Sequence, residues 1–286
     1  MKIAFFNDYR LGVVAGDSIV DVSAEVADVP HTGPGNLISN VIGAWDDLGP
    51  RIAAAAARGA KLPLASVTLR PPLPRPGNIV CMAVNYMEDG TKTEPAPINA
   101  FQKASTAIIG PGDTMVLPDV AATIFEGEAE LALIIGKKAT QVSAADAMDY
   151  VFGYSIFNDV SVRDYQFRVT QYTGGKNFRS SGPFGPVIVT ADELTDPHRL
   201  DIRTTINGEV MQSANTDTMV FDIPTILEHI ADFIDLEAGD VIPMGTPAGV
   251  GFKRKPPIFL KDGDTVSIEI SGIGTLTNPV VNETAP

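Results

Sequence analysis

Three glutamates occupy alternate positions in the segment Phe125-Glu126-Gly127-Glu128-Ala129-Glu130, directly before the apolar run 131–135. In an extended strand, residues two positions apart lie on the same face. We therefore expect Glu126, Glu128 and Glu130 to hold their carboxylates close together at the start of a buried strand. Like charges repel there, and more strongly as water is excluded. A divalent cation, which prefers oxygen ligands, would neutralise them, so the spacing indicates a metal site.

A solvated acidic edge strand is the alternative interpretation, because charged residues commonly protect the exposed edges of sheets. The uninterrupted apolar run 131–135 behind the glutamates instead favours a strand that is buried on both faces. Metal binding is therefore the preferred interpretation of this segment.

A further acidic residue, Asp159, follows the apolar segment 154–157. The end of a strand on a rigid sheet is a favoured position for a functional group, so Asp159 is expected to supply a third carboxylate. Three carboxylates leave coordination positions open for water or substrate oxygens, as is typical of Mg²⁺. On local sequence alone, an N-cap for a helical turn that begins near Ser161 is an equal alternative for Asp159.

Two later segments carry candidate substrate contacts. Lys176 lies in the glycine-rich stretch 174–178, where it could bind a substrate carboxylate or offset the negative charge of the site. An ordinary surface lysine is the alternative. The loop 244–251 contains Thr246 among small residues, which suits close approach of the backbone to a small, oxygen-bearing ligand. This loop lacks the lysine of a Walker loop and matches no nucleotide fingerprint.

The elements that must position these residues are mostly strands. Composition and turn signals predict strands at 79–84, 106–109, 130–136, 151–157, 186–190, 201–206, 240–244 and 264–270. One amphipathic helix is predicted after Asp222, a natural N-cap, and its apolar stripe extends to Ile234. Many strands and few helices predict an α+β, mainly β body with helices packed outside it.

A proline-rich segment divides the chain. Residues 1–70 are expected to form a small N-terminal α/β unit, with helices near 37–48 and 51–58. The segment 71–77 is predicted to be a stiff linker. Residues 78–286 are then expected to form the catalytic body.

Composition narrows the class of partner. The chain of 286 residues has a net charge of −14, which argues against nucleic acid and anionic membranes as partners. No apolar run reaches the length needed to cross a bilayer, and the first residues contain no apolar signal region. A single cysteine, Cys81, fits a reducing compartment. We therefore expect a cytoplasmic enzyme that acts on a small molecule.

Together these segments resemble the fumarylacetoacetate hydrolase family across roughly 78–282. The similar stretches are 79–86, 125–137, 158–166, Lys176 with 182–186, 207–209 and 236–251, in the family's order. The resemblance implies a mixed β-roll and a homodimer. It also implies Mg²⁺ or Mn²⁺ bound by Glu128, Glu130 and Asp159, with Glu126 beside the ligands rather than among them.

The same resemblance assigns roles in substrate binding or in orienting water. The residues concerned are Tyr86, Arg163, Gln166, Lys176 and Thr246. One motif departs from the family, whose hydrolytic members carry histidine and glutamate after an Asn-Tyr pair. Here Asp89 stands in place of that histidine and Lys92 in place of that glutamate. The three histidines of the chain, His31, His198 and His229, lie outside the family motifs and are expected to be structural or surface residues.

Three functions remain open. The first is metal-dependent hydrolysis of a C–C bond in an acylpyruvate or related 2,4-dioxo acid, with Glu88 or Asp89 as the base that activates water and Lys176 holding the substrate carboxylate. The second is decarboxylation or tautomerisation of a 2-oxo acid at the same metal, which needs a stabilised enolate but no attacking water. The third is a non-catalytic ligand-binding homologue. Hydrolysis is placed first and the second function is its alternative, although the missing histidine moves weight from hydrolysis towards the second function. The third is placed last, because Glu128, Glu130, Asp159 and Lys176 all remain.

Overall fold

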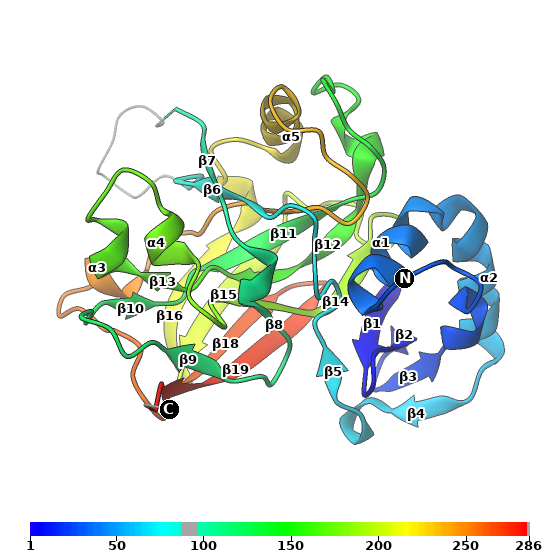
Figure 1. Cartoon of the computed structure of the whole chain (residues 1–286), viewed down its shortest axis with the longest axis horizontal. Helices are drawn as coiled ribbons and strands as arrows, with labels where there is room; N and C mark the ends of the chain where they lie inside the picture. The colour runs from blue at the N-terminus through cyan, green and yellow to red at the C-terminus, as the bar shows by residue number, and fades with distance from the viewer. Residues whose placement is uncertain (87–96, 285–286) are drawn as a thin grey trace.

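The computed structural model of the chain describes residues 1–86 and 97–284, and it is mainly β with helices at the periphery (Figure 1). Within these residues, ten strands form one mixed sheet. Eight of them follow the order β17 (Val241–Pro243), β11 (Ala129–Ile135), β12 (Val151–Asn158), β14 (Gly182–Thr190), β1 (Lys2–Phe6), β2 (Arg10–Ala15), β3 (Ser18–Asp21) and β4 (Lys61–Pro63). The other two, β5 (Leu69–Arg70) and β8 (Ile108–Ile109), pair with β1 and β14.

The two central strands of the body, β11 and β12, are buried along their whole length. Their apolar sequences explain this burial, because alternate side chains must enter cores on both faces of the sheet. Leu131 and Leu133 of β11 join one core, whereas Ala132 and Ile134 join the core on the other face. The strand that begins just after the glutamates is therefore held rigidly from both sides.

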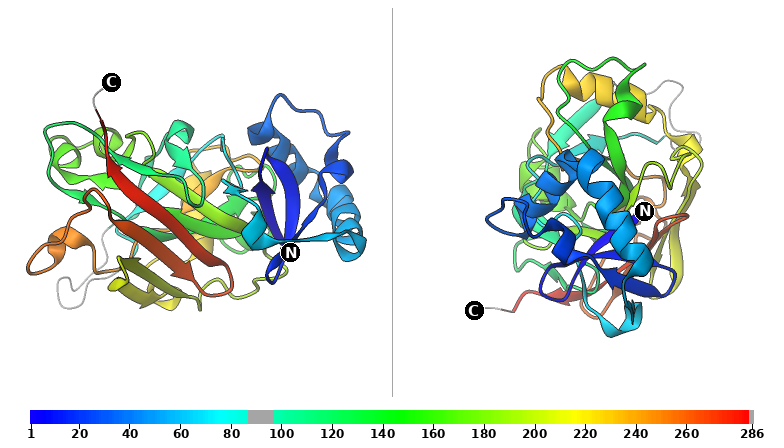
Figure 2. Two further views of the ribbon diagram at one scale, coloured as in Figure 1. Left: turned by 90° about the horizontal axis from the view of Figure 1, so that it is seen from below. Right: turned by 90° about the vertical axis from the view of Figure 1, so that its right-hand side faces the viewer.

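A second sheet packs against the first of these cores. Its strands follow the order β16 (Glu209–Asn215), β15 (Asp201–Ile206), β18 (Thr265–Ile270), β19 (Gly274–Asn282) and β9 (Met115–Leu117). Two short pairs complete the strands, β6 (Val80–Ala83) with β7 (Asn99–Gln102) and β10 (Phe125–Glu126) with β13 (Ser161–Val162). Figure 2 shows β18 and β19 lying across one face of the body.

The helices cover the outside of the sheets. They are α1 (Pro34–Gly43), α2 (Trp45–Arg58), α3 (Arg163–Gln166), α4 (Thr173–Lys176) and α5 (Ile223–Ala231). Helix α5 begins where the sequence predicts, because Asp222 accepts a hydrogen bond from the Thr225 N–H at a distance of 2.9 Å. Helices α1 and α2 meet at Ala44, so the helix expected at 37–48 is in fact the end of one helix and the start of the next. No helix in the described part of the chain is long and apolar enough to cross a membrane.

The N-terminal segment shares its sheet with the body. Strand β1 pairs antiparallel with β14, with Lys2 opposite Val189 and Ile3 opposite Ile188. Helices α1 and α2 lie at this end of the molecule, opposite the end that carries α3 and α4 (Figure 1). The hydrogen-bonded ladder therefore continues between the segment 1–70 and the body, and the division at 71–77 stays a prediction.

Candidate metal and substrate site

The antiparallel pairing of β11 with β12 brings three carboxylates together. Ala129 lies opposite Asn158, so Glu128 at the start of one strand lies beside Asp159 at the end of the other. The Asp159 N–H donates to the Glu128 carbonyl oxygen over 3.0 Å, which extends the ladder by one step. One carboxylate oxygen from each of Glu128, Glu130 and Asp159 lies within 4.8 Å of the others, and all three residues are buried.

The remaining glutamate, Glu126, takes a different direction because the extended segment is interrupted after β10. Its Oε2 accepts a hydrogen bond from Arg163 Nε at 3.0 Å, and its Oε1 accepts one from the Phe252 N–H at 2.7 Å. The expectation that all three alternate glutamates converge is therefore corrected. Nor does Asp159 cap a helix, because it is fully buried, and α3 begins after Val162 with no side-chain cap.

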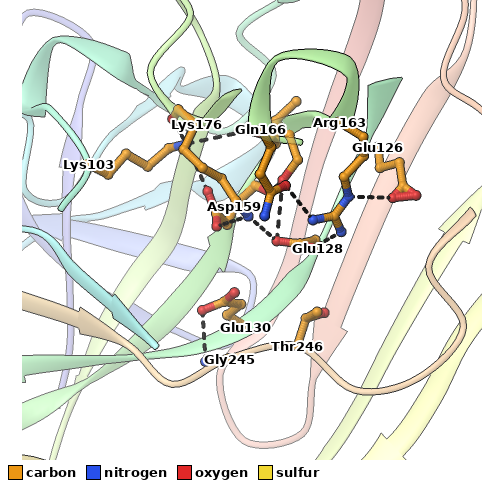
Figure 3. Close-up of polar contacts among 12 residues, drawn as sticks. Lys103, Glu126, Glu128, Glu130, Asp159, Arg163, Gln166, Lys176, Gly245 and Thr246 are labelled. Carbon is orange, nitrogen blue, oxygen red and sulfur yellow. Dashed lines mark hydrogen bonds and ion pairs between the residues drawn. The ribbon is translucent and has the colours of Figure 1, made fainter. Parts of the chain in front are cut away.

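Three buried basic side chains form ion pairs with two of the carboxylates, Glu128 and Asp159, whereas Glu130 lies apart from them (Figure 3). Lys176 Nζ lies 2.5 Å from both Glu128 Oε2 and Asp159 Oδ2. Lys103 Nζ lies 2.8 Å from Asp159 Oδ1, and Arg163 Nη2 donates to Glu128 Oε1. Lys103 is a site residue that the sequence did not reveal, since it follows a short strand far from the other motifs and nothing local marks it as buried.

The local charges shift the pKa values of these groups in opposite directions. Burial raises the pKa of Glu130 well above its usual value, and the charges of Asp159 and Glu128 raise it further. Burial also acts to raise the pKa of Asp159, but Lys103 and Lys176 outweigh it and lower that pKa. Burial acts to lower the pKa of Lys176, yet Asp159 and Glu128 hold it above the usual value. Of the three candidate ligands, Glu130 is thus the one whose negative charge the described basic side chains compensate least.

The donor set fits a hard divalent cation. All three candidate ligands offer carboxylate oxygens, which Mg²⁺ and Mn²⁺ accept. The Glu130 carboxylate accepts one hydrogen bond from the described residues, to Oε2 from the Gly245 N–H at 2.9 Å. A buried carboxylate with so few partners is costly unless a cation binds it. Gly245 has a φ of +90°, and a Cβ there would lie 2.8 Å from the Asn85 Cβ, so glycine is needed for this close approach.

A cavity of about 230 Å³ opens beside Glu128 and Glu130. All five residues expected to bind substrate border it, namely Tyr86, Arg163, Gln166, Lys176 and Thr246. The rest of the wall is largely apolar and comes from Met82, Ala83, Val84, Phe101, Tyr172, Val220, Pro247, Ala248, Val250, Phe252 and Lys253. The candidate bases Glu88 and Asp89, like Lys92, lie outside the described residues.

Two of the wall residues have distinct hydrogen-bonding states. The Gln166 Oε1 accepts from Arg163 Nη1 at 2.7 Å, so these two side chains orient each other. The buried Tyr86 hydroxyl has no hydrogen-bond partner among the described residues. Buried polar groups are normally paired, so this hydroxyl is available to a ligand in the cavity.

None of the three histidines borders this cavity. His198 Nε2 accepts a hydrogen bond from the Ile223 N–H at 3.1 Å, at the start of α5. His31 contacts the Val29 carbonyl oxygen, and the His229 ring packs against Phe233. Each histidine therefore has a local structural contact of its own.

Comparison with known proteins identifies the class. Residues 78–281 match the family described as fumarylacetoacetate (FAA) hydrolase C-terminal, which is well over half of the chain. The chain belongs to the fumarylacetoacetate hydrolase family, a family of enzymes, as its motifs indicated.

Different relatives are named for different activities. The chain is 43% identical over 234 residues to the mitochondrial oxaloacetate tautomerase FAHD2A of Homo sapiens, covering 80% of this chain and 74% of that protein. The mitochondrial oxaloacetate tautomerase Fahd2a of Rattus norvegicus is 41% identical over 233 residues, covering 80% of this chain and 74% of that protein. A maleylpyruvate hydrolase from a Sphingobium strain, solved with manganese(II) and pyruvate, matches with a TM-score of 0.87 and 37% identity, covering 99% of this chain and 100% of that one.

These comparisons decide several expectations. The family and the mainly β fold are confirmed. The cytoplasmic location is wrong, because the vertebrate relatives are named as mitochondrial proteins. The names support tautomerisation or isomerisation at least as well as hydrolysis, which the sequence had placed first. The homodimer and the roles of the individual site residues stay predictions.

Proposed function

We propose that this protein is a divalent-metal-dependent tautomerase of a 2-oxo acid, and that oxaloacetate is the first substrate to test. One observation carries the proposal. Two members of the buried carboxylate triad, Glu128 and Glu130, border the cavity together with cationic and hydroxyl donors, and none of the three histidines of the chain borders it. Such a site can stabilise an enolate but offers, among the described residues, no histidine to activate water.

The chemistry of tautomerisation suits these groups. Interconversion of keto and enol forms moves one proton between C3 and the oxygen on C2, and it consumes no water. A cation bound by Glu128, Glu130 and Asp159 would stabilise the negative charge that develops on that oxygen. Lys176 is buried and charged at the same wall, so we assign it to a substrate carboxylate or to the same oxygen.

The remaining donors suit the second carboxylate of a dicarboxylic substrate. Arg163 and Thr246 border the cavity, and the Tyr86 hydroxyl has no partner among the described residues. The apolar part of the wall excludes water from the carbon skeleton, which strengthens the polar contacts around it. The vertebrate relatives named oxaloacetate tautomerase support this substrate class.

The proposal is tested with Mn²⁺-loaded protein and enol-oxaloacetate. Malate dehydrogenase and NADH report the keto form as it appears, with the uncatalysed rate as baseline. We expect acceleration that disappears in EDTA and in Asp159→Asn. Equal acceleration by the EDTA-treated protein would contradict metal-dependent catalysis. No acceleration by the metal-loaded protein would contradict oxaloacetate as the substrate.

A second candidate is hydrolysis of an acylpyruvate, favoured by the full-length match to maleylpyruvate hydrolase. Here Glu88 or Asp89 would be the base. Incubation with acetylpyruvate, followed by NMR, distinguishes the two functions, because hydrolysis releases acetate and pyruvate. Oxaloacetate in the same experiment shows decarboxylation as pyruvate and CO₂. Loss of acetate production in Glu88→Gln or Asp89→Asn would support the hydrolytic assignment.

A further inference from the structure

A buried glutamine outside the cavity wall, Gln212 of β16, joins the acidic strand to Thr246. Its Oε1 accepts hydrogen bonds from the Ala129 N–H at 3.2 Å and from the Thr204 hydroxyl at 2.8 Å. Its Nε2 donates to Thr246 Oγ1 and to the Pro247 carbonyl oxygen, both at 2.8 Å. Gln212 is 2% exposed, and every polar atom of its amide is engaged.

The chemistry of the partners fixes which way this amide faces. A backbone N–H can only donate, so the atom facing Ala129 must be the amide oxygen. A carbonyl oxygen can only accept, so the atom facing Pro247 must be the amide nitrogen. The two partners agree, and a flipped amide would break both contacts. The Gln212 amide therefore donates a hydrogen to Thr246 Oγ1.

This donation determines what the Thr246 hydroxyl can do. A hydroxyl has two acceptor lone pairs and one hydrogen. Because Gln212 occupies an acceptor position, the Thr246 hydrogen must point elsewhere, and it has no acceptor among the described residues. Thr246 also borders the cavity. Its hydroxyl is thereby set to donate to an oxygen of whatever lies there.

The same glutamine also sets the position of Thr246 relative to the metal ligands. Ala129, which it binds, lies between Glu128 and Glu130 on the chain. The Gly245 N–H, next to Thr246, donates to Glu130. The loop 244–247 is thus tied to the carboxylate strand at two points, and Thr246 borders the same cavity as Glu128 and Glu130.

We propose that Gln212 is a positioning residue, which fixes the Thr246 hydroxyl as a hydrogen-bond donor to an anionic oxygen of the substrate. The identity of that oxygen, on a 2-oxo acid, rests on the proposed function. The orientation itself does not. Gln212 acts only through Thr246, so its effect on anion binding must vanish when the Thr246 hydroxyl is absent.

The test is a double-mutant cycle read by calorimetry, with oxalate as the anion and Mn²⁺-loaded protein. We expect Gln212→Met and Thr246→Val each to weaken oxalate binding roughly tenfold, the loss of one hydrogen bond to a charged group. The double variant should bind no more weakly than Thr246→Val alone. Thr246→Ser should keep its affinity for oxalate and remain sensitive to Gln212→Met.

Two further variants test whether Gln212 orients the Thr246 hydroxyl or only supports the local structure. Gln212→Glu keeps an acceptor for Ala129 and Thr204 but replaces the donor to Thr246, so it should also weaken oxalate binding. Thr204→Val removes a contact on the opposite side of the amide, and Thr204 does not border the cavity. It should change oxalate affinity less than twofold. Thermal unfolding of every variant verifies that it folds.

The binding measurements decide whether Gln212 positions Thr246, whether or not the protein turns over oxaloacetate. Additive losses in the double variant, or failure of the wild-type protein to bind oxalate, would overturn it. A parallel tenfold loss of Mn²⁺ affinity in Gln212→Met would also overturn it, because that result assigns the glutamine to the metal strand. Non-additive losses without any oxaloacetate turnover would uphold the inference while refuting the proposed function.

Discussion

Lys176 Nζ lies 2.5 Å from Asp159 Oδ2, and both side chains are buried. The lysine therefore occupies a position from which it neutralises the carboxylate that a cation would also use. A cation that binds the triad must share Asp159 with this ammonium group.

Replacing this lysine should separate metal binding from substrate binding. In Lys176→Met, a positive charge that repels the cation is removed, so Mn²⁺ affinity should stay the same or increase. Turnover of enol-oxaloacetate should fall by roughly 100-fold, since a charged contact to the anionic substrate is lost. Calorimetry with Mn²⁺ and the coupled assay measure the two effects. A fall in both by the same factor would refute the assignment of Lys176 to the substrate.

Glu128, a candidate metal ligand, and its neighbour Glu126 provide a matched pair of variants. Glu128→Gln should lower Mn²⁺ affinity by roughly 100-fold or more, because even changes beside a metal ligand cost 10- to 100-fold. Glu126→Gln should lower it by only about tenfold, the lower end of that range, since that carboxylate binds Arg163 and the Phe252 N–H instead of the cation. Titration of metal-free protein with Mn²⁺ measures both. The reverse order would place the ligands one pleat away from the assignment made here.

The buried lysine behind Asp159 should matter for folding. Lys103→Met removes one of the two basic partners of the Asp159 carboxylate and leaves Lys176, so we expect the free energy of unfolding to fall by about 2–3 kcal/mol. Lys138 offers a control, because its contact with Glu237 is exposed at a distance of 4.0 Å. Lys138→Met should cost less than about 1 kcal/mol. Denaturant unfolding in EDTA compares the two variants, and equal losses would contradict a buried pair.

The raised pKa of Glu130 predicts a pH dependence of stability in metal-free protein. A carboxyl group whose pKa is raised on folding binds more protons in the folded state than in the unfolded state. The contribution of Glu130 to the free energy of unfolding is therefore complete below the ordinary glutamate pKa of about 4.3. It is lost as the pH rises from there to the raised pKa of the folded protein, by up to about 1.4 kcal/mol per pH unit. Glu130→Gln should remove this decline and stabilise the metal-free protein near neutral pH, while Mn²⁺ binding is lost.

Unfolding measured in EDTA across pH tests this sign. Asp159 supplies the internal contrast, because its pKa is lowered and its contribution is lost as pH falls through that lowered pKa. Asp159→Asn should therefore lose stability at neutral pH, where Glu130→Gln gains it. A loss in both variants would contradict the opposite shifts of the two carboxyl groups.

Replacing Tyr86 should have different effects on stability and on substrate binding. Tyr86→Phe removes a buried hydroxyl that has no partner in the described part of the chain, so the free energy of unfolding should stay the same or rise by about 1 kcal/mol. If the hydroxyl binds substrate, the KM for enol-oxaloacetate should rise roughly tenfold. Thermal unfolding and the coupled assay measure the two changes. An unchanged KM would remove Tyr86 from the substrate contacts.

The sequence predicted the strands and helices whose turn residues and helix caps mark their limits. The strand at 201–206 has the predicted limits, and the helix after Asp222 begins as its cap indicates. Strand β19 was missed because Pro279 and two asparagines interrupt its β-forming residues. Strand β16 was missed because its residues alternate weakly, although the Asn207-Gly208 turn before it is a hairpin signal.

The candidate site was predictable where neighbouring strands supply it. Glu128, Glu130 and Asp159 follow or precede apolar runs, so their positions at strand ends could be inferred. Lys103 and Gln212 could not, because each contacts the site across more than fifty residues of chain and neither lies in a pattern of its own. Such contacts depend on how the sheets pack, which local periodicity does not encode.

The candidate metal ligands and the wall of the cavity lie in parts of the molecule that tolerate substitution to different degrees. The carboxylates lie at the ends of two strands that are buried on both faces, where a substitution disturbs two cores at once. Much of the wall, including Thr246 and Val250, lies on the loop after β17, where side chains can be exchanged at lower cost. The family can therefore retain one carboxylate centre while the cavity beside it changes, which agrees with the tautomerase and hydrolase names of the relatives.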